Sequence, residues 1–124
     1  MKDPSNPVSR TISTLLSRIG DKWTVLVVAT LGDGPRRFNE LRREIPSVSQ
    51  RMLTLTLRNL ERDGIVSRTV TPSIPPRVDY ELTPLGHSLL KPITALSDWA
   101  LEHVEQIHQA QTNFDAEADR RQAA

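Results

Sequence analysis

The sequence predicts a mainly α-helical domain that carries one small β-ribbon, an α+β fold. Apolar residues recur at helical spacing over residues 8–63, the spacing changes to strand-like alternation over 65–83, and helical spacing then returns. A short helix, a turn, a second helix and a two-stranded ribbon in this order predict a winged helix-turn-helix. We expect the N- and C-terminal helices to form a dimer interface beside it.

Length and composition narrow the possibilities further. The chain has 124 residues, enough for one domain, and only 4% aromatic residues, so Leu, Ile and Val must build the core. It has no cysteine, which excludes disulfides, thiolate nucleophiles and thiol redox sensing. No segment approaches the roughly 18 apolar residues of a membrane span, and the first residues lack the apolar region of a signal peptide. We therefore expect a cytoplasmic protein with no membrane partner.

The first two helices are predicted from their ends. Residues 1–7 contain two prolines and no periodic pattern, so we expect them to be flexible before a helix over 8–19. The apolar, β-branched run 23–31 suits either a buried helix or a strand by periodicity alone. Asp21 before it and the Gly-Asp-Gly-Pro segment 32–35 after it favour a helix.

The helix-turn-helix is predicted next. A short amphipathic helix over 38–45 ends at Pro46, and Ser47 or Ser49 then caps a helix that runs to Asp63. The apolar side of this second helix consists of Leu53, Leu57 and Leu60, and its polar side consists of Gln50, Arg51, Thr54, Arg58, Glu61 and Arg62.

The wing and the last helix complete the pattern. Residues 65–71 and 78–83 alternate as the strands of a hairpin, with a proline-rich tip at 72–77. Thr83-Pro84 predicts the start of a last helix, with Pro92 as a kink and about 93–111 as a dimerisation segment. We expect one winged domain over 8–111 and a disordered tail over 112–124, which holds a single large apolar residue.

Charge is distributed unevenly along the chain. Residues 34–77 carry nine basic and four acidic side chains, whereas residues 98–124 carry two and six. A basic middle joined to an acidic end favours an anionic partner, most commonly nucleic acid. The alternative is an ordinary solvated surface of mixed charge.

Five blocks of sequence also carry a family resemblance. They are GDKW (20–23), GPRRFNEL (34–41), SQRMLT (49–54), LRNLERDG (57–64) and PPRVDYELTPLG (75–86). Together they resemble the HxlR family of bacterial winged-helix transcription factors, which is related to MarR-type regulators, over roughly residues 7–100. The resemblance implies a homodimer that binds a pseudo-palindromic operator in double-stranded DNA. We expect a repressor that occludes its operator and is released by a ligand.

The resemblance also implies which residues contact DNA. In the family, the contacting residues lie on the recognition helix, at the entry to the helix before it and at an arginine of the wing. The matching residues of this chain are Arg36, Arg37, Asn39, Ser49, Gln50, Arg51, Thr54, Arg58 and Arg77. Arginine is suited to bidentate contact with guanine and to a narrow minor groove. The alternative is that Arg51 and Arg58 are only the solvated face of an amphipathic helix.

The dimer interface is predicted from an apolar stripe that is longer than a small lobe covers. With the first helix it would form an isologous interface of Ile12, Leu15, Ile93, Leu96, Trp99, Ala100, Val104 and Ile107. The alternative is that the last helix folds back on its own lobe. No Lys or Arg occurs between Asp98 and Asp119, so this end should lie away from DNA.

The chain departs from the family at one position. Many members carry Cys-Pro near the N-terminus and sense oxidants through that thiol, whereas this chain has Asn6-Pro7. Any small-molecule effector must therefore bind non-covalently. We expect it between the dimerisation helices and the DNA-binding lobe, although no ligand signature marks such a pocket.

The sequence contains no recognisable catalytic or metal-binding pattern. His87, His103 and His108 lack partners at metal-ligand spacing, and there is no nucleophile elbow or phosphate loop. We expect no enzyme, cofactor or metal site. The alternative function is a winged-helix protein-interaction module without specific DNA binding, with Leu55 and Ile74 as anchors. An exposed face rich in arginine and poor in aromatic residues argues against it.

Overall fold

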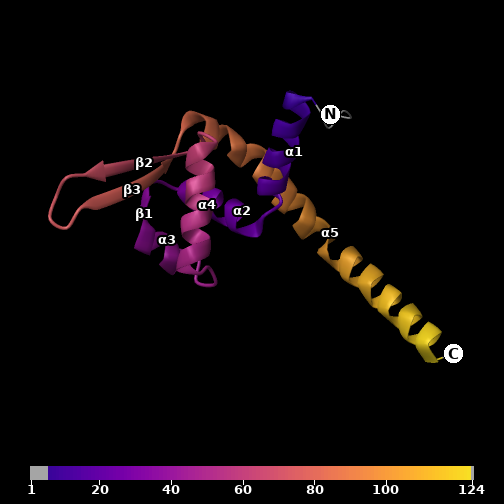
Figure 1. Ribbon diagram of the computed structural model, residues 1–124. Helices are drawn as coiled ribbons and strands as arrows, with labels where there is room; N and C mark the ends of the chain where they lie inside the picture. The colour runs from indigo at the N-terminus through magenta and orange to yellow at the C-terminus, as the bar shows by residue number, and fades with distance from the viewer. Residues whose placement is uncertain (1–5, 124) are drawn as a thin grey trace. The chain divides into compact units, whose positions relative to one another are not determined.

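The computed structural model describes residues 6–123 (Figure 1). Its elements in chain order are α1 (Pro7–Ile19), α2 (Lys22–Leu31), β1 (Arg36–Arg37), α3 (Phe38–Glu44), α4 (Gln50–Arg62), β2 (Val66–Thr71), β3 (Arg77–Leu82) and α5 (Pro84–Ala123). The chain divides into two compact units, one up to Lys91 and one from Pro92 onward. Within 6–123, no helix is both long enough and apolar enough to cross a bilayer.

Side-chain caps begin the first two helices. The Asn6 Oδ1 atom accepts a hydrogen bond from the Val8 N–H at 2.8 Å, with Pro7 in the first helical turn. Asn6 is therefore the N-cap of α1 and Pro7 its first residue, which corrects the predicted flexible segment 1–7 at these two positions. Residues 1–5 lie outside the described residues. Asp21 accepts from the Trp23 N–H at 2.8 Å, and Gly32 ends α2, so the predicted helix is confirmed.

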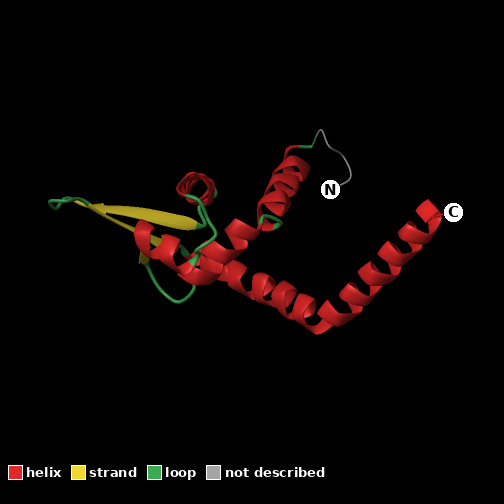
Figure 2. Cartoon of the chain, turned by 90° about the horizontal axis from the view of Figure 1, so that it is seen from below, coloured by secondary structure: helices red, strands yellow, loops and turns green. Residues whose placement is uncertain are grey.

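The core of the first unit lies where α2, α3, α4 and the base of the hairpin meet. Its most buried side chains are Val27, Val28, Leu31, Leu41, Leu53, Leu57, Leu60 and Val66. The predicted apolar stripe of α4 is thus confirmed, and burial of each leucine stabilises the fold by about 1.5–3 kcal/mol. Figure 2 views α4 end-on beside the strands. This packing fixes which side of α4 faces outward.

The sheet has three antiparallel strands in the order β1-β3-β2. The hairpin pairs Val66 with Leu82 at its base and Thr71 with Arg77 near its tip. Gly64, at φ +77°, makes the turn from α4 into β2. The sequence pattern does not predict β1, because two residues are too short to show alternation.

Thr83 joins the hairpin base to the start of α5. Its hydroxyl oxygen accepts from the Gly86 N–H at 3.1 Å, as an N-cap does, and its hydroxyl donates to the Gly64 carbonyl at 2.5 Å. The Thr83 N–H also donates to the Ile65 carbonyl at 3.0 Å. The predicted helix start at Thr83-Pro84 is confirmed.

Helix α5 continues to Ala123, which corrects the predicted disorder of 112–124 over the described residues. Seven of residues 112–123 are Ala, Arg, Glu or Gln, all good helix formers. The Glu117 carboxylate also pairs with Arg120 at 2.7 Å and with Arg121 at 3.7 Å, one turn away. At the C-terminus, Ala124 lies outside the described residues. Pro92 lies inside the helix.

Candidate nucleic-acid interface

The outward side of α4 presents polar side chains in a row. Ser49 begins the helix, because its hydroxyl oxygen accepts from the Met52 N–H at 3.0 Å. Gln50 and Arg51 in the first turn are exposed, and so is Arg58 two turns after Arg51. The Thr54 hydroxyl donates to the Gln50 carbonyl at 2.8 Å, which leaves its oxygen able to accept from a partner.

A first hollow lies between α4 and the hairpin, and we call it the α4–wing hollow. It measures about 510 Å³ and is lined by Phe38, Gln50, Thr54, Leu57, Arg58, Glu61, Arg68 and Tyr80. Three predicted DNA-binding residues meet there. Arg68 and Tyr80 face each other across β2 and β3 and are not among the residues that the sequence predicts for DNA binding. Counting in twos from buried Val66 places Arg68 on the same side of the strand, so strand register was the signal that could have found it.

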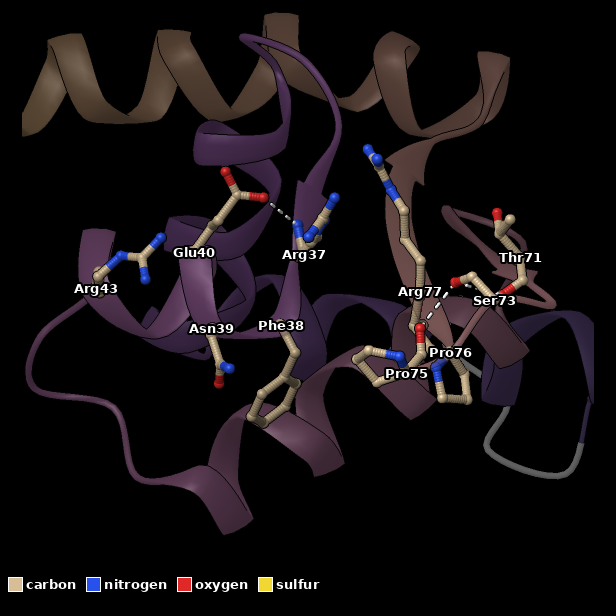
Figure 3. A pocket seen from close by; sticks show the side chains of 11 residues that line it. Arg37, Phe38, Asn39, Glu40, Arg43, Thr71, Ser73, Pro75, Pro76 and Arg77 are labelled. Atoms are coloured by element: carbon tan, nitrogen blue, oxygen red, sulfur yellow. Dashed lines mark hydrogen bonds between the residues drawn. The ribbon is translucent and has the colours of Figure 1, made fainter.

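A second hollow lies between α3 and the hairpin tip, and we call it the α3–wing hollow. It measures about 990 Å³, and its lining includes the predicted residues Arg37, Asn39 and Arg77. Arg43 and Ser73 also line it and were not predicted. Figure 3 shows the Arg37 and Arg77 side chains extending in the same direction, with Arg43 beyond Glu40.

Two predicted arginines have partners within the chain. Arg36 donates from Nε to the Glu44 carboxylate at 2.8 Å and from Nη1 to the carbonyls of Gly34 and Pro35 at 3.0 Å. These bonds tie the guanidinium of Arg36 to the loop before β1, and Arg36 lines neither hollow. Arg77 pairs with Asp79 at 2.9 Å but keeps 51% of its side chain exposed.

Other arginines on these surfaces carry uncompensated charge. Within residues 6–123, no carboxylate forms an ion pair with Arg37, Arg43, Arg51, Arg58 or Arg68. Glu40 is nearby, but it accepts from the backbone N–H of Arg37 at 2.9 Å and so caps α3. Guanidinium groups without an internal counter-ion make a positive surface that suits phosphate groups.

The residues of the predicted dimer interface that are exposed lie in the second unit. Leu96, Trp99, Ala100, Val104 and Ile107 are all exposed, with Leu96 at 60% and Trp99 at 55%. The His103 ring stacks on Trp99 with ring centroids 4.7 Å apart.

The remaining members of that set are less accessible. Ile93 is buried, and on α1 the side chains of Ile12 and Leu15 are half-buried.

No group of three or more potential metal ligands is found within 6–123.

A helix-turn-helix of α3 and α4, followed by a wing and bordered by basic hollows, defines a winged helix-turn-helix protein. Residues 18–108 match the HxlR-like helix-turn-helix family, and the chain belongs to that family. The resemblance carried by the five sequence blocks is therefore confirmed, and the class of the protein is that of helix-turn-helix transcriptional regulators.

Individual relatives agree with this assignment. The uncharacterized HTH-type transcriptional regulator YdeP of Bacillus subtilis is 42% identical over 106 residues, which are 86% of this chain and 83% of that protein. The solved structure of the transcriptional regulator ytfH from Salmonella typhimurium has a TM-score of 0.75 at 36% identity, covering 89% of this chain and 95% of that one. The redox regulator HypR in its reduced form has a TM-score of 0.73 at 40% identity, covering 80% and 98%.

Proposed function

We propose that this protein is a homodimeric, sequence-specific DNA-binding repressor that occludes a pseudo-palindromic operator in the cytoplasm. The observation that carries this proposal is the set of unpaired arginines around the α4–wing and α3–wing hollows. They come from α3, α4, β1 and β2, and their charges lack internal partners among the described residues. A duplex supplies the missing anions along its backbone.

In this proposal α4 lies in the major groove and the hairpin reaches the flanking minor groove. Gln50 and Arg58 project from the exposed side of α4, where an amide suits adenine and a guanidinium suits guanine. Arg77 lies at the start of β3, near the tip, where a guanidinium suits a narrow minor groove. Arg37 and Arg43 would hold the backbone between these two contacts.

The dimer is proposed from the exposed apolar stripe on α5. Phe114 follows Ile107 by seven residues, two helical turns, and is 73% exposed, so the stripe continues past the predicted end at residue 111. An isologous pairing of two such helices would remove this apolar surface from water. We propose that Ile12 and Leu15 of α1 also belong to the dimer interface.

Release from the operator is proposed to follow non-covalent binding of a small molecule. HypR is described as a redox regulator, but this chain has no cysteine. A thiol switch is therefore excluded here, and the effector must act through contacts that change the separation of the two recognition helices.

Selection of bound duplexes from a random library tests this function directly. We expect enrichment of a two-fold symmetric site with half-sites about one helical turn apart. On that site, affinity should fall steeply with salt because phosphate contacts release counter-ions.

Single substitutions then test the two contact regions. Arg58→Ala and Arg77→Ala should each weaken binding by roughly 1–3 kcal/mol. Arg120→Ala is the matched control, because Arg120 is paired with Glu117 on α5 and should leave affinity unchanged. A wild-type affinity independent of salt, or equal effects of all three substitutions, would count against the proposal.

A protein-interaction module is the second candidate. Leu55 on α4 is 51% exposed and Ile74 at the hairpin tip is fully exposed, as anchors for a partner protein would be. Absence of any enriched site, with no measurable binding to random duplex at low salt, would favour this function instead.

A further inference from the structure

The tip of the hairpin presents an apolar side chain that the proposed DNA contacts do not use. Ile74 lies between the end of β2 and the start of β3, and it is the most exposed large apolar residue within 6–123. Figure 1 shows the tip projecting away from α4. Within the first unit, no other segment extends as far from α4 in this direction.

The tip is held in a defined conformation before any partner binds. Pro72, Pro75 and Pro76 fix their own φ angles. The Ser73 hydroxyl donates to the Pro75 carbonyl at 2.8 Å, and the Ser73 N–H donates to the Thr71 carbonyl at 2.9 Å. Little conformational freedom remains to be lost on binding, so the tip is preorganised.

The charge around the tip is of one sign. Residues 64–78 contain two arginines, Arg68 and Arg77, and no acidic residue. The α3–wing hollow, with Arg37, Arg43 and Arg77 in its lining, begins directly behind the tip at Ser73. A rigid apolar point backed by guanidinium groups has the chemistry of side chains that enter the minor groove and part a base step.

We propose that Ile74 is an apolar wedge that inserts into a base step from the minor groove beside each half-site and bends the operator. This inference rests on the proposed function. Partial unstacking at the step widens the minor groove and bends the duplex toward its major groove, away from the inserted side chain. The widened groove admits the hairpin tip more deeply, so the guanidinium groups of the α3–wing hollow contact the phosphate groups that border it. Two wedges in a dimer would place two symmetric bends outside the recognition helices, and wedges of this kind kink a duplex by roughly 20–90°.

The test uses the full-length protein on the operator obtained by selection, with 2-aminopurine substituted in turn at each flanking position. Unstacking of this base raises its fluorescence. We expect one step on each side to brighten when the wild-type protein binds. With Ile74→Ala at saturating protein, the brightening should disappear and the bend measured by end-to-end energy transfer should decrease. Operator affinity should fall by roughly ten-fold, which corresponds to about 1.4 kcal/mol.

Two further variants separate a wedge from a loss of folding or of general apolar surface. Ile74→Leu keeps an apolar point of similar volume and should retain brightening and bending. Val70→Thr removes an exposed apolar group from β2, 48% exposed, while keeping a β-branched residue, and should leave all readouts unchanged. Thermal unfolding of Ile74→Ala should match the wild type, because the side chain makes no buried contact.

Each remaining outcome overturns a specific statement. Brightening that is absent with the wild type, or that persists with Ile74→Ala, overturns the wedge while the proposed function stands. Equal DNA binding and bending by Ile74→Ala with loss of regulation in cells assigns Ile74 to a protein partner and also overturns it. If the wild type selects no operator at all, the proposed function itself fails.

Discussion

Arg18, near the end of α1, forms an ion pair with the carboxylate of Asp63 at the C-cap of α4, and both side chains are mostly buried. The same Nη1 atom donates to the Asn59 carbonyl in the last turn of α4 at 3.0 Å. Arg18 thus places a positive charge at the negative end of the helix dipole. It joins a helix of the proposed dimer interface directly to the proposed recognition helix.

We expect Arg18→Met to lower the free energy of unfolding by about 1–3 kcal/mol, because it leaves the carboxylate and a helix carbonyl without their charged donor. Denaturant unfolding of this variant, of Asp63→Asn and of the double variant gives the coupling energy. Strictly additive effects would show that the pair does not act as a unit.

Gly86 permits the close approach of α5 to the hairpin base. A Cβ atom at this position would lie 2.2 Å from the Ile65 carbonyl oxygen. We expect Gly86→Ala to lower the free energy of unfolding by about 2–3 kcal/mol, since backbone must move to admit the methyl group.

Gly20→Ala is the matched control for that substitution. Gly20 has φ −72°, and its Cβ would meet the nearest atom at an ordinary 3.4 Å. It should stabilise the protein by about 0.4–1 kcal/mol. Similar thermal midpoints for the two variants would contradict the close approach at Gly86.

If the apolar stripe of α5 forms the dimer interface, a charged side chain placed on it should weaken the dimer. Val104→Asp should shift the protein toward monomer in sedimentation equilibrium, because an aspartate would be buried without a partner between two helices. Leu101→Asp is the control: Leu101 is 76% exposed but lies to one side of the stripe. A dimer that tolerates the first substitution and not the second would place the interface on another face of α5.

Arg68 predicts an extension of the DNA contact beyond the residues matched by the family resemblance. Because Arg68 lines the α4–wing hollow with Arg58, we expect Arg68→Ala to weaken binding and to reduce the slope of log affinity against log salt by about 1. Arg68→Lys should retain most of the slope, since it keeps the charge. An unchanged slope in Arg68→Ala would remove this residue from the interface.

Much of this protein was determined by local sequence. Asp21 and Thr83 predict the starts of α2 and α5, because a short polar side chain can satisfy the unpaired N–H groups of a helix end. For α4 the sequence offers Ser47 or Ser49 as the cap, and the structure has Ser49. The spacing of Leu53, Leu57 and Leu60 predicts which side of α4 is buried. These features depend on residues three or four positions apart, and the structure confirms them.

Other features arise only when distant segments meet. β1 exists because Arg36 and Arg37 pair with Tyr80 and Asp79. Arg36 is matched to a DNA-contacting position, but its guanidinium is held by Glu44 and by nearby carbonyls. In the same way, register brings Arg68 and Tyr80 to the α4–wing hollow.

Periodicity, caps and charge are local properties, and they predict the helices as far as residue 111, the wing and the basic character of the middle of the chain. Which arginines keep an unpaired charge and which are bound internally is settled by the folded chain. That choice depends on distances of a few ångströms between side chains far apart in the sequence, since ion pairs and hydrogen bonds act only at such range.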